Sequence, residues 1–354
     1  MKIEYRVFIF ICCISALSFL GASFFSDGAQ AAPDVKPIFE IPVGSDDTAE
    51  TGVAGEWVVE EEIADYDKFY FPAAFCADPK SGLIFVLDSA RNRILAFSNE
   101  GKPAGELKIP FDFPPSDLAW HAGLETFFVV FSDRPQIAAL KVAIKEGLAL
   151  RSHKLLELEG LSEMAPGIQN IWPCASSSDK ENIFALTFNS GCDSAGASFL
   201  YAGDKFLKLH DIEGEIEYVA ASQEKPCVYM IGANAASKIA LVEMDLRSGK
   251  ISETALLNEF LSKKSGYGCV SCRSIGADAA GNIYLEAHFS SGEISDKAFV
   301  YKFDKNMKQL GKAEIFTSPE MLSNRYVYLD ASGAVYYMKL DITNKKIQFY
   351  RFAF

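Results

Sequence analysis

The sequence of 354 residues is short of positive charge and of helical pattern. Lys and Arg number 34 against 47 Asp and Glu, which gives a formal net charge of -13. A field of this sign repels phosphate backbones, so we do not expect nucleic acid as a partner. Most of the chain beyond residue 31 also lacks a sustained apolar period of 3.6 residues, which disfavours a helical fold.

Histidine is scarce as well, with four residues at positions 121, 153, 210 and 288. The segment "GCDSAG" around Cys192 looks superficially like the nucleophile loop of trypsin-like proteases. None of the four histidines lies in a matching context, and a triad is recognised by geometry rather than by a few letters. We interpret this segment as a Gly-rich turn between strands.

The first 31 residues have the pattern of an export signal. Lys2 and Arg6 precede an apolar run from Val7 to Phe25, and Ala29-Gln30-Ala31 meets the small-x-small rule for signal peptidase. We therefore predict a signal peptide over residues 1–31 and a secreted or periplasmic protein with no membrane span after cleavage. The apolar run is long enough to cross a bilayer, so an uncleaved N-terminal membrane anchor is the alternative.

One strand-like pattern recurs along the chain. An aromatic residue flanked by apolar residues returns at intervals that range from 43 (85 to 128) to 56 (128 to 184) residues. The aromatics are Phe85, Phe128, Phe184, Tyr229, Tyr284 and Tyr336. Each copy follows a polar turn, such as "CADPKSG" or "GADAAGN", and precedes another strand-like run.

Six four-stranded units of about 45 to 50 residues match the spacing of propeller blades. We predict an all-β fold, a six-bladed β-propeller of four-stranded antiparallel blades. It would form a single domain over residues 55–354, after a flexible tether over residues 32–54. A β-sandwich with accidental regularity is the alternative. We expect one short helix, over residues 253–264, in a linker between units.

The two ends of this domain indicate how the ring would close. The last unit, residues 325–354, stops at Phe354 without an outer strand, and "GEWVVEEEI" at residues 55–63 is an unassigned strand. We expect this N-terminal strand, from Trp57 to Ile63, to pair with the last blade and cover its exposed edge.

The segment "FPAAFCADPKSGLIFVLDSARNRILAFSNEG", residues 71–101, resembles an NHL repeat. The matching positions are Pro72, Asp78, Gly82, Asp88, Asn92, Arg93, Ile94 and Gly101. The fifth unit, "SIGADAAGNIYLEA", matches only the first half of the repeat. The resemblance implies a propeller fold and does not identify a ligand.

Six cysteines remain after the predicted signal peptide, and an even number fits an oxidising compartment. They are Cys76, Cys174, Cys192, Cys227, Cys269 and Cys272. Cys269 and Cys272 are close in "CVSC", and we predict a local disulfide between them. The sequence does not choose a pairing for the other four.

In a propeller, the loops between second and third strands share one face with the loops that enter the first strands. On this face we predict a ligand-binding set of Arg91, Arg93, Arg134, Trp172, Arg273 and Arg325. Arg beside Trp binds carboxylates, sulfates or sugars through paired hydrogen bonds and stacking. The alternative is structural, with Asp88 and Arg93 clamping their own blade.

Nothing catalytic stands out, so we expect a monomeric extracytoplasmic binding or scaffold propeller without a cofactor. Its partner would be a protein, a glycan or a small anionic molecule. The alternative is a metal-dependent propeller hydrolase or lyase of the lactonase type, which holds a divalent cation such as Ca²⁺. Oxygen ligands would then converge from several blades, and Asp117, Asn170 and Glu217 are the candidates.

Overall fold

The described chain is almost entirely β-strand. The computed structural model describes residues 36–44, 53–54, 56–59, 67–70, 72–144, 147–157, 168–173, 183–188, 198–202, 205–208, 215–222, 227–233, 239–245, 250–257, 268–290, 297–315, 325–341 and 343–354. The expected signal peptide lies outside them. Within these ranges the only helix is the 3-10 turn η1 (Ser89–Arg91), so no described helix has the length or apolarity to span a membrane.

All described strands except β3 and β4 form six sheets of four or five strands. Sheet I contains β5 (Ala74–Asp78), β6 (Leu83–Asp88), β7 (Arg93–Ser98) and β8 (Pro103–Lys108). Sheet II contains β9 (Pro115–His121), β10 (Thr126–Phe131), β11 (Arg134–Ala143) and β12 (Ala149–Glu157). Sheet III contains β13 (Ile168–Pro173), β14 (Ile183–Phe188), β15 (Ser198–Ala202) and β16 (Lys205–Lys208).

The second half of the chain repeats this plan. Sheet IV contains β17 (Glu215–Ala221), β18 (Cys227–Ala233), β19 (Ile239–Asp245) and β20 (Ile251–Leu256). Sheet V contains β21 (Gly268–Ala277), β22 (Ile283–Ser290), β23 (Lys297–Phe303) and β24 (Gln309–Ile315). Sheet VI contains β25 (Val327–Leu329), β26 (Ala334–Asp341), β27 (Lys346–Ala353), β1 (Phe39–Gly44) and β2 (Val53–Ala54).

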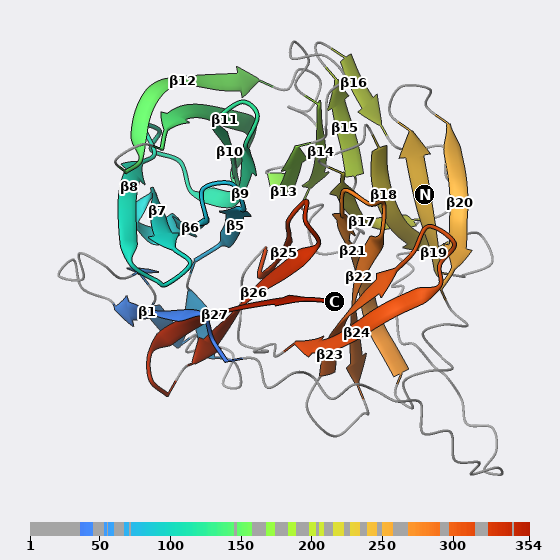
Figure 1. Cartoon of the computed structure of the whole chain (residues 1–354). Coiled ribbons are helices and arrows are strands. Elements are labelled where there is room, and N and C mark those ends of the chain that lie inside the picture. Colours follow the sequence, from blue (N-terminus) through green and yellow to red (C-terminus); the bar gives the residue numbers. More distant parts are fainter. Residues whose placement is uncertain are drawn as a thin grey trace, which may run out of the picture.

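The arrangement of these sheets is that of a β-propeller. In sheets I to V, consecutive strands pair antiparallel in chain order. The first strands of successive sheets contact one another, from β5 and β9 round to β25 and β5, and they lie nearest the centre of the molecule (Figure 1). Four-stranded meanders placed radially in this way are typical of propeller blades. The predicted all-β propeller fold class is therefore confirmed.

The recurring aromatics occupy equivalent strands. All six lie in the second strand of their sheets, namely β6, β10, β14, β18, β22 and β26. Phe85, Tyr229 and Tyr284 are among the largest fully buried side chains of the described core. Phe85 packs edge-on to Phe127 of the next sheet, with ring centroids 4.8 Å apart. The period in the sequence therefore marks the contacts that pack one sheet against the next.

An aspartate closes the turn between the first and second strands in three sheets. Asp78 accepts from the backbone N–H groups of Lys80 and Ser81 in sheet I. Asp278 and Asp330 accept from backbone N–H groups of the corresponding turns in sheets V and VI. A side chain that takes over such bonds stabilises the turn locally. The polar turn motif is thus structural in these sheets.

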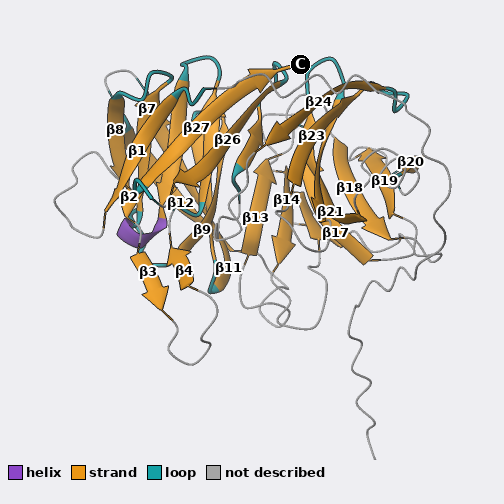
Figure 2. Cartoon of the chain, turned by 90° about the horizontal axis from the view of Figure 1, so that it is seen from below, coloured by secondary structure: helices purple, strands orange, loops and turns teal. Residues whose placement is uncertain are grey.

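The N-terminal strand that extends the last sheet differs from the expected one. β1 pairs antiparallel with β27, with Phe39 opposite Phe349 and Ile41 opposite Ile347. The strand predicted for this role begins in β3 (Glu56–Val59), which instead pairs with β4 (Asp67–Tyr70) and projects from one side of the molecule (Figure 2). The expected pairing is therefore wrong, because β1 has the alternation of buried and exposed residues that fits this edge.

Two local expectations also fail. Residues 39–44 and 53–54 form β1 and β2, so these parts of residues 32–54 are not a tether. β20 covers residues 251–256 as the outer strand of sheet IV, so the helix expected over 253–264 is wrong there. Residues 258–264 lie outside the described residues. A short apolar run does not distinguish an outer strand from a helix.

We predict that Phe39→Ala destabilises the protein by about 3 kcal/mol, the usual cost of emptying a buried aromatic site. Phe39 stacks on Phe349 at 4.7 Å and on Phe97 of sheet I at 5.9 Å, so its ring holds sheet VI against sheet I. Urea unfolding followed by Trp fluorescence measures the change. Lys36→Ala, at an exposed position just before β1, is the control. A loss below about 1 kcal/mol for Phe39→Ala would show that β1 contributes little.

Candidate functional site

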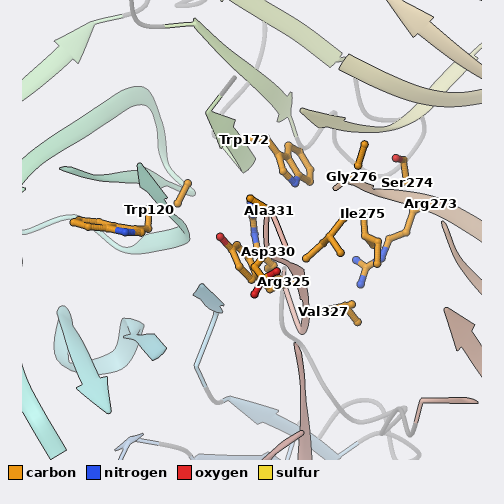
Figure 3. Close-up of a pocket in the computed structure, with 14 residues that line it drawn as sticks. Trp120, Trp172, Arg273, Ser274, Ile275, Gly276, Arg325, Val327, Asp330 and Ala331 are labelled. Atoms are coloured by element: carbon orange, nitrogen blue, oxygen red, sulfur yellow. The ribbon is translucent and has the colours of Figure 1, made fainter. Parts of the chain in front are cut away.

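A pocket lies at the centre, where the first strands of several sheets meet. Its lining runs along β21 and β25 and includes Trp172 from β13. The polar side chains in the lining are Arg273, Ser274, Arg325 and Asp330. Figure 3 shows Trp172, Asp330 and Arg325 around the middle of the pocket. We call the space that these residues enclose the central pocket.

Arg325, just before β25, crosses the centre of the molecule. Its Nε and Nη2 donate to the two oxygens of Asp117 in β9, at 3.1 and 2.6 Å. Nη2 also donates to the backbone carbonyl of Ile171 in β13, and the guanidinium carbon lies 5.0 Å from the centre of the Trp172 ring. One buried side chain of sheet VI therefore links sheets II and III.

The carboxylate of Asp117 is fully used in this arrangement. Besides the two bonds from Arg325, it accepts from the backbone N–H groups of Leu118 and Ile171, both at 2.8 Å. A carboxylate has about four acceptor positions, and here all are taken beside a positive charge. Asp117 is thus unsuited to bind a divalent cation.

The other two candidate metal ligands lie in the first strands of sheets III and IV. Asn170 is half-buried in β13, and Glu217 belongs to β17 with its side chain outside the described residues. Among the described residues, no three potential metal ligands cluster. The structure therefore lends no support to the predicted metal set.

Arg273 extends from the central pocket to a buried glutamate. Its Nε lies 2.5 Å from Glu286 Oε2, and its guanidinium carbon lies 4.5 Å from the centre of the Tyr326 ring. His288 Nε2 is 2.7 Å from Glu286 Oε1, which also accepts from the Tyr326 hydroxyl. Burial raises the pKa of Glu286, but the charge of Arg273 and these hydrogen bonds outweigh it and lower the pKa to about 2. The carboxylate is thus ionised at neutral pH.

The remaining three arginines of the predicted set do not line the central pocket. Arg93 is buried and bonds Asp88 and Glu106, both at 2.8 Å. Arg91 lies 3.8 Å from Asp88. These contacts agree with the structural alternative, in which Asp88 and Arg93 clamp their own blade.

Arg134 lies in a different place, at the start of β11. It pairs with Asp133 at 2.9 Å, and its guanidinium carbon lies 3.3 Å above the centre of the Phe113 ring. The structure therefore gathers Trp172, Arg273 and Arg325 at the central pocket and leaves Arg134 outside its lining.

The two cysteines of the predicted disulfide lie in the same strand. Cys269 and Cys272 lie three residues apart in β21. A strand rises about 3.3 Å per residue, which separates their Cα atoms by about 10 Å, whereas a disulfide needs less than about 7 Å. The register shift between Cys269 and Ser271 bends the strand locally. The disulfide stays a prediction, because the side chain of Cys269 lies outside the described residues.

Sequence reasoning missed Ser274, Asp330, Glu286, His288 and Tyr326. A signal existed for two of them. Glu286 and His288 interrupt the apolar second strand "YLEAHF" two residues apart, so their side chains point to the same face of the sheet. No comparable pattern marks Tyr326.

Neither a protein-family model nor a curated protein sequence matches the chain, so the resemblance to NHL repeats stays a prediction. Among solved structures, a luciferin-regenerating enzyme matches with 14% identity over 86% of this chain and 96% of that one, at a TM-score of 0.49. The Dos1 propeller matches with 10% identity over 85% and 83%, at 0.48. A gluconolactonase from Xanthomonas campestris matches with 10% identity over 89% and 97%, at 0.45. Similarity this low carries no argument about activity.

We predict that Arg325→Ala destabilises the protein by about 3–5 kcal/mol, because it leaves Asp117 charged, buried and without its ion-pair partner. Chemical denaturation of the parent and the variant measures the difference. Arg151→Ala is the matched control, since its pair with Glu125 is exposed on both sides and is worth at most about 1 kcal/mol. Equal losses for the two variants would contradict the structural role of Arg325.

Acid should weaken the fold through Glu286. A carboxyl whose folded pKa is lowered stabilises the fold above its unfolded pKa, and this contribution is lost as pH falls through the folded pKa. For Glu286 the loss runs from about pH 4.5 to about 2 and amounts to about 3 kcal/mol. Glu286→Gln should remove this part of the pH dependence of unfolding, whereas Glu106→Gln, a half-exposed partner of Arg93, should keep it. If the free energy of unfolding changes with pH in the same way for the parent and for Glu286→Gln, Glu286 is not the group responsible.

Proposed function

We propose that the six sheets are blades of one ring, closed through β1 and sheet VI, and that the protein is an extracytoplasmic binding propeller. Its ligand is a small anionic or saccharide-like molecule held in the central pocket. The proposed ring is supported by the contact of β25 with β5 and by the backbone bridge between Arg325 and Ala74. The export pattern of residues 1–31 supports the location.

The observation that carries this proposal is a pair of polar atoms in the pocket lining. Ser274 and Asp330 are 3% and 1% exposed, and Ser274 Oγ and Asp330 Oδ2 have no hydrogen-bond partner in the described part of the chain. Buried polar groups are nearly always paired, and leaving one unpaired costs about 1–3 kcal/mol. A ligand that brings hydroxyl groups into the pocket would pair both atoms.

The rest of the lining suits the same class of ligand. Trp172 offers an aromatic face, on which sugar rings stack. The Arg273 side chain is 22% exposed and carries positive charge at the pocket. An acidic sugar could place its ring against Trp172 and its carboxylate toward Arg273. The metal-dependent hydrolase alternative is less favoured, because Asp117 has no acceptor position left for a cation.

Calorimetric titration with D-glucuronate, D-glucose and acetate tests the proposal. We expect D-glucuronate to bind and acetate not to bind. Trp172→Ala should abolish binding, whereas Arg134→Ala, at a residue outside the pocket lining, should not change it. If none of the three probes binds the parent protein, the proposed ligand class is wrong.

Ser274→Ala separates a role in binding from a role in folding. Ser274 Oγ has no partner to lose in the described structure, so the variant should unfold at the same denaturant concentration as the parent. Its affinity for D-glucuronate should fall by about 5- to 30-fold, because the loss of one hydrogen bond costs about one to two kcal/mol of binding free energy. A destabilised variant with unchanged affinity would assign Ser274 to the fold.

A further inference from the structure

A second group of polar side chains lies between sheets V and VI, next to the central pocket. It consists of Glu286 and His288 on β22 and Tyr326 just before β25, with Arg273 shared between this group and the pocket. Glu286 is completely buried. Taking a carboxylate out of water costs several kcal/mol unless its partners compensate. Such groups are candidates for chemistry as well as for structure.

The ionised state of Glu286 fixes the proton on His288. The Oε1 atom accepts from the Tyr326 hydroxyl and lies 2.7 Å from His288 Nε2. An ionised carboxylate can only accept hydrogen bonds. Nε2 must therefore carry a proton and donate it to Glu286, and in the neutral ring Nδ1 is then an acceptor.

The acceptor Nδ1 makes no hydrogen bond within the described residues. Both hydrogen bonds of the His288 ring within the described residues use Nε2, at 2.7 Å to Glu286 and 2.8 Å to the Tyr326 oxygen. The side chain is 19% exposed. A carboxylate that binds one ring nitrogen while the other faces a reactant is the arrangement by which histidine acts as a general base.

The group is also close to the proposed binding site. Arg325 and Val327, on either side of Tyr326 in the chain, both line the central pocket, and so does Arg273. A ligand in the pocket therefore lies next to Arg273, which contacts Glu286, and next to the two chain neighbours of Tyr326, which contacts both Glu286 and His288. The two sites share Arg273 as a source of positive charge.

We propose that Glu286, His288 and Tyr326 form an acid–base site that hydrolyses small activated carboxylic esters. His288 is the catalytic residue, whereas Glu286 and Tyr326 are positioning residues that act through it. The reaction requires water as its only co-reactant, and the site requires no metal ion. This activity goes beyond the proposed ligand binding and does not depend on it.

The step balances within this set of groups. His288 Nδ1 takes a proton from water while the water oxygen bonds to the ester carbonyl carbon, and the carbonyl electron pair moves to its oxygen. When that pair returns, the bond from carbon to the alcohol oxygen breaks. The imidazolium then gives its proton to the departing alkoxide, which leaves an acid, an alcohol and neutral His288. Glu286 keeps its negative charge throughout.

Hydrolysis of p-nitrophenyl acetate by the purified protein is the first test. A positioned general base contributes about 10²- to 10⁴-fold, so His288→Asn should lower kcat/KM by about 100-fold or more. His153→Asn is the control, because His153 is exposed on β12 and far from the site in the fold. Tyr326→Phe should retain part of the rate. Activity of the parent no higher than that of His288→Asn overturns the proposal.

Chemical modification gives a readout that does not depend on a variant folding. Diethyl pyrocarbonate attacks an unprotonated imidazole nitrogen, and mass spectrometry of peptides locates the product. We expect modification of His288 in the folded parent to proceed in step with loss of esterase activity. Full modification of His288 with activity retained overturns the proposal. If His288→Asn still binds D-glucuronate, the proposed binding function is unaffected. The binding proposal and the esterase proposal can therefore fail independently.

Discussion

The ion pair between Arg325 and Asp117 joins positions 208 residues apart, and the centre of the molecule is arranged around it. A single guanidinium just before β25 bonds the neighbouring sheets II and III there. A buried pair is tolerated only when its remaining hydrogen-bonding positions are also met, and the backbone N–H groups of Leu118 and Ile171 meet them.

This arrangement also decides what the central pocket offers. Arg325 is committed to Asp117, so its charge is largely neutralised within the protein. Arg273 is paired with Glu286 but stays partly exposed. Both arginines are thus balanced by carboxylates, and Asp330 adds a further carboxyl group to the lining. The hydrogen-bonding capacity of Ser274 and Asp330 therefore becomes more important for selecting a ligand than net charge. A pocket of this kind favours hydroxyl-rich molecules over simple anions.

The repeat was predictable because it depends on local pattern. Phe85 and its five counterparts were expected in strands, and the structure places each of them in the second strand of its sheet. Partnership between distant strands was not predictable in the same way. Pro37 lies just before β1 and Pro42 lies within it, and proline is usually a sign against a strand, whereas residues 55–63 have the stronger strand pattern. Nothing in either pattern identifies β27 as a partner.

The same limit applies to side chains at the site. Trp172 in β13, Arg273 in β21 and Arg325 just before β25 all line the central pocket, but the sequence could not show which carboxylate each arginine would meet. That choice depends on register to within one residue, because a shift of one turns a strand residue to the other face. Arg93 bonds a carboxylate five residues away, which a sequence can suggest. Tyr326 meets Glu286 across 40 residues, which it cannot.

The pairing of β1 with β27 has a consequence for how the chain reaches its native state. Glu40 and Gln348, which hydrogen-bond across these strands, are 308 residues apart. A ribosome releases the N-terminal strand long before its partner exists, so β1 waits with unpaired backbone groups while the intervening sheets form. Contacts this distant in sequence slow the final step of folding. During that interval β1 has an unpaired edge that can mispair with other chains.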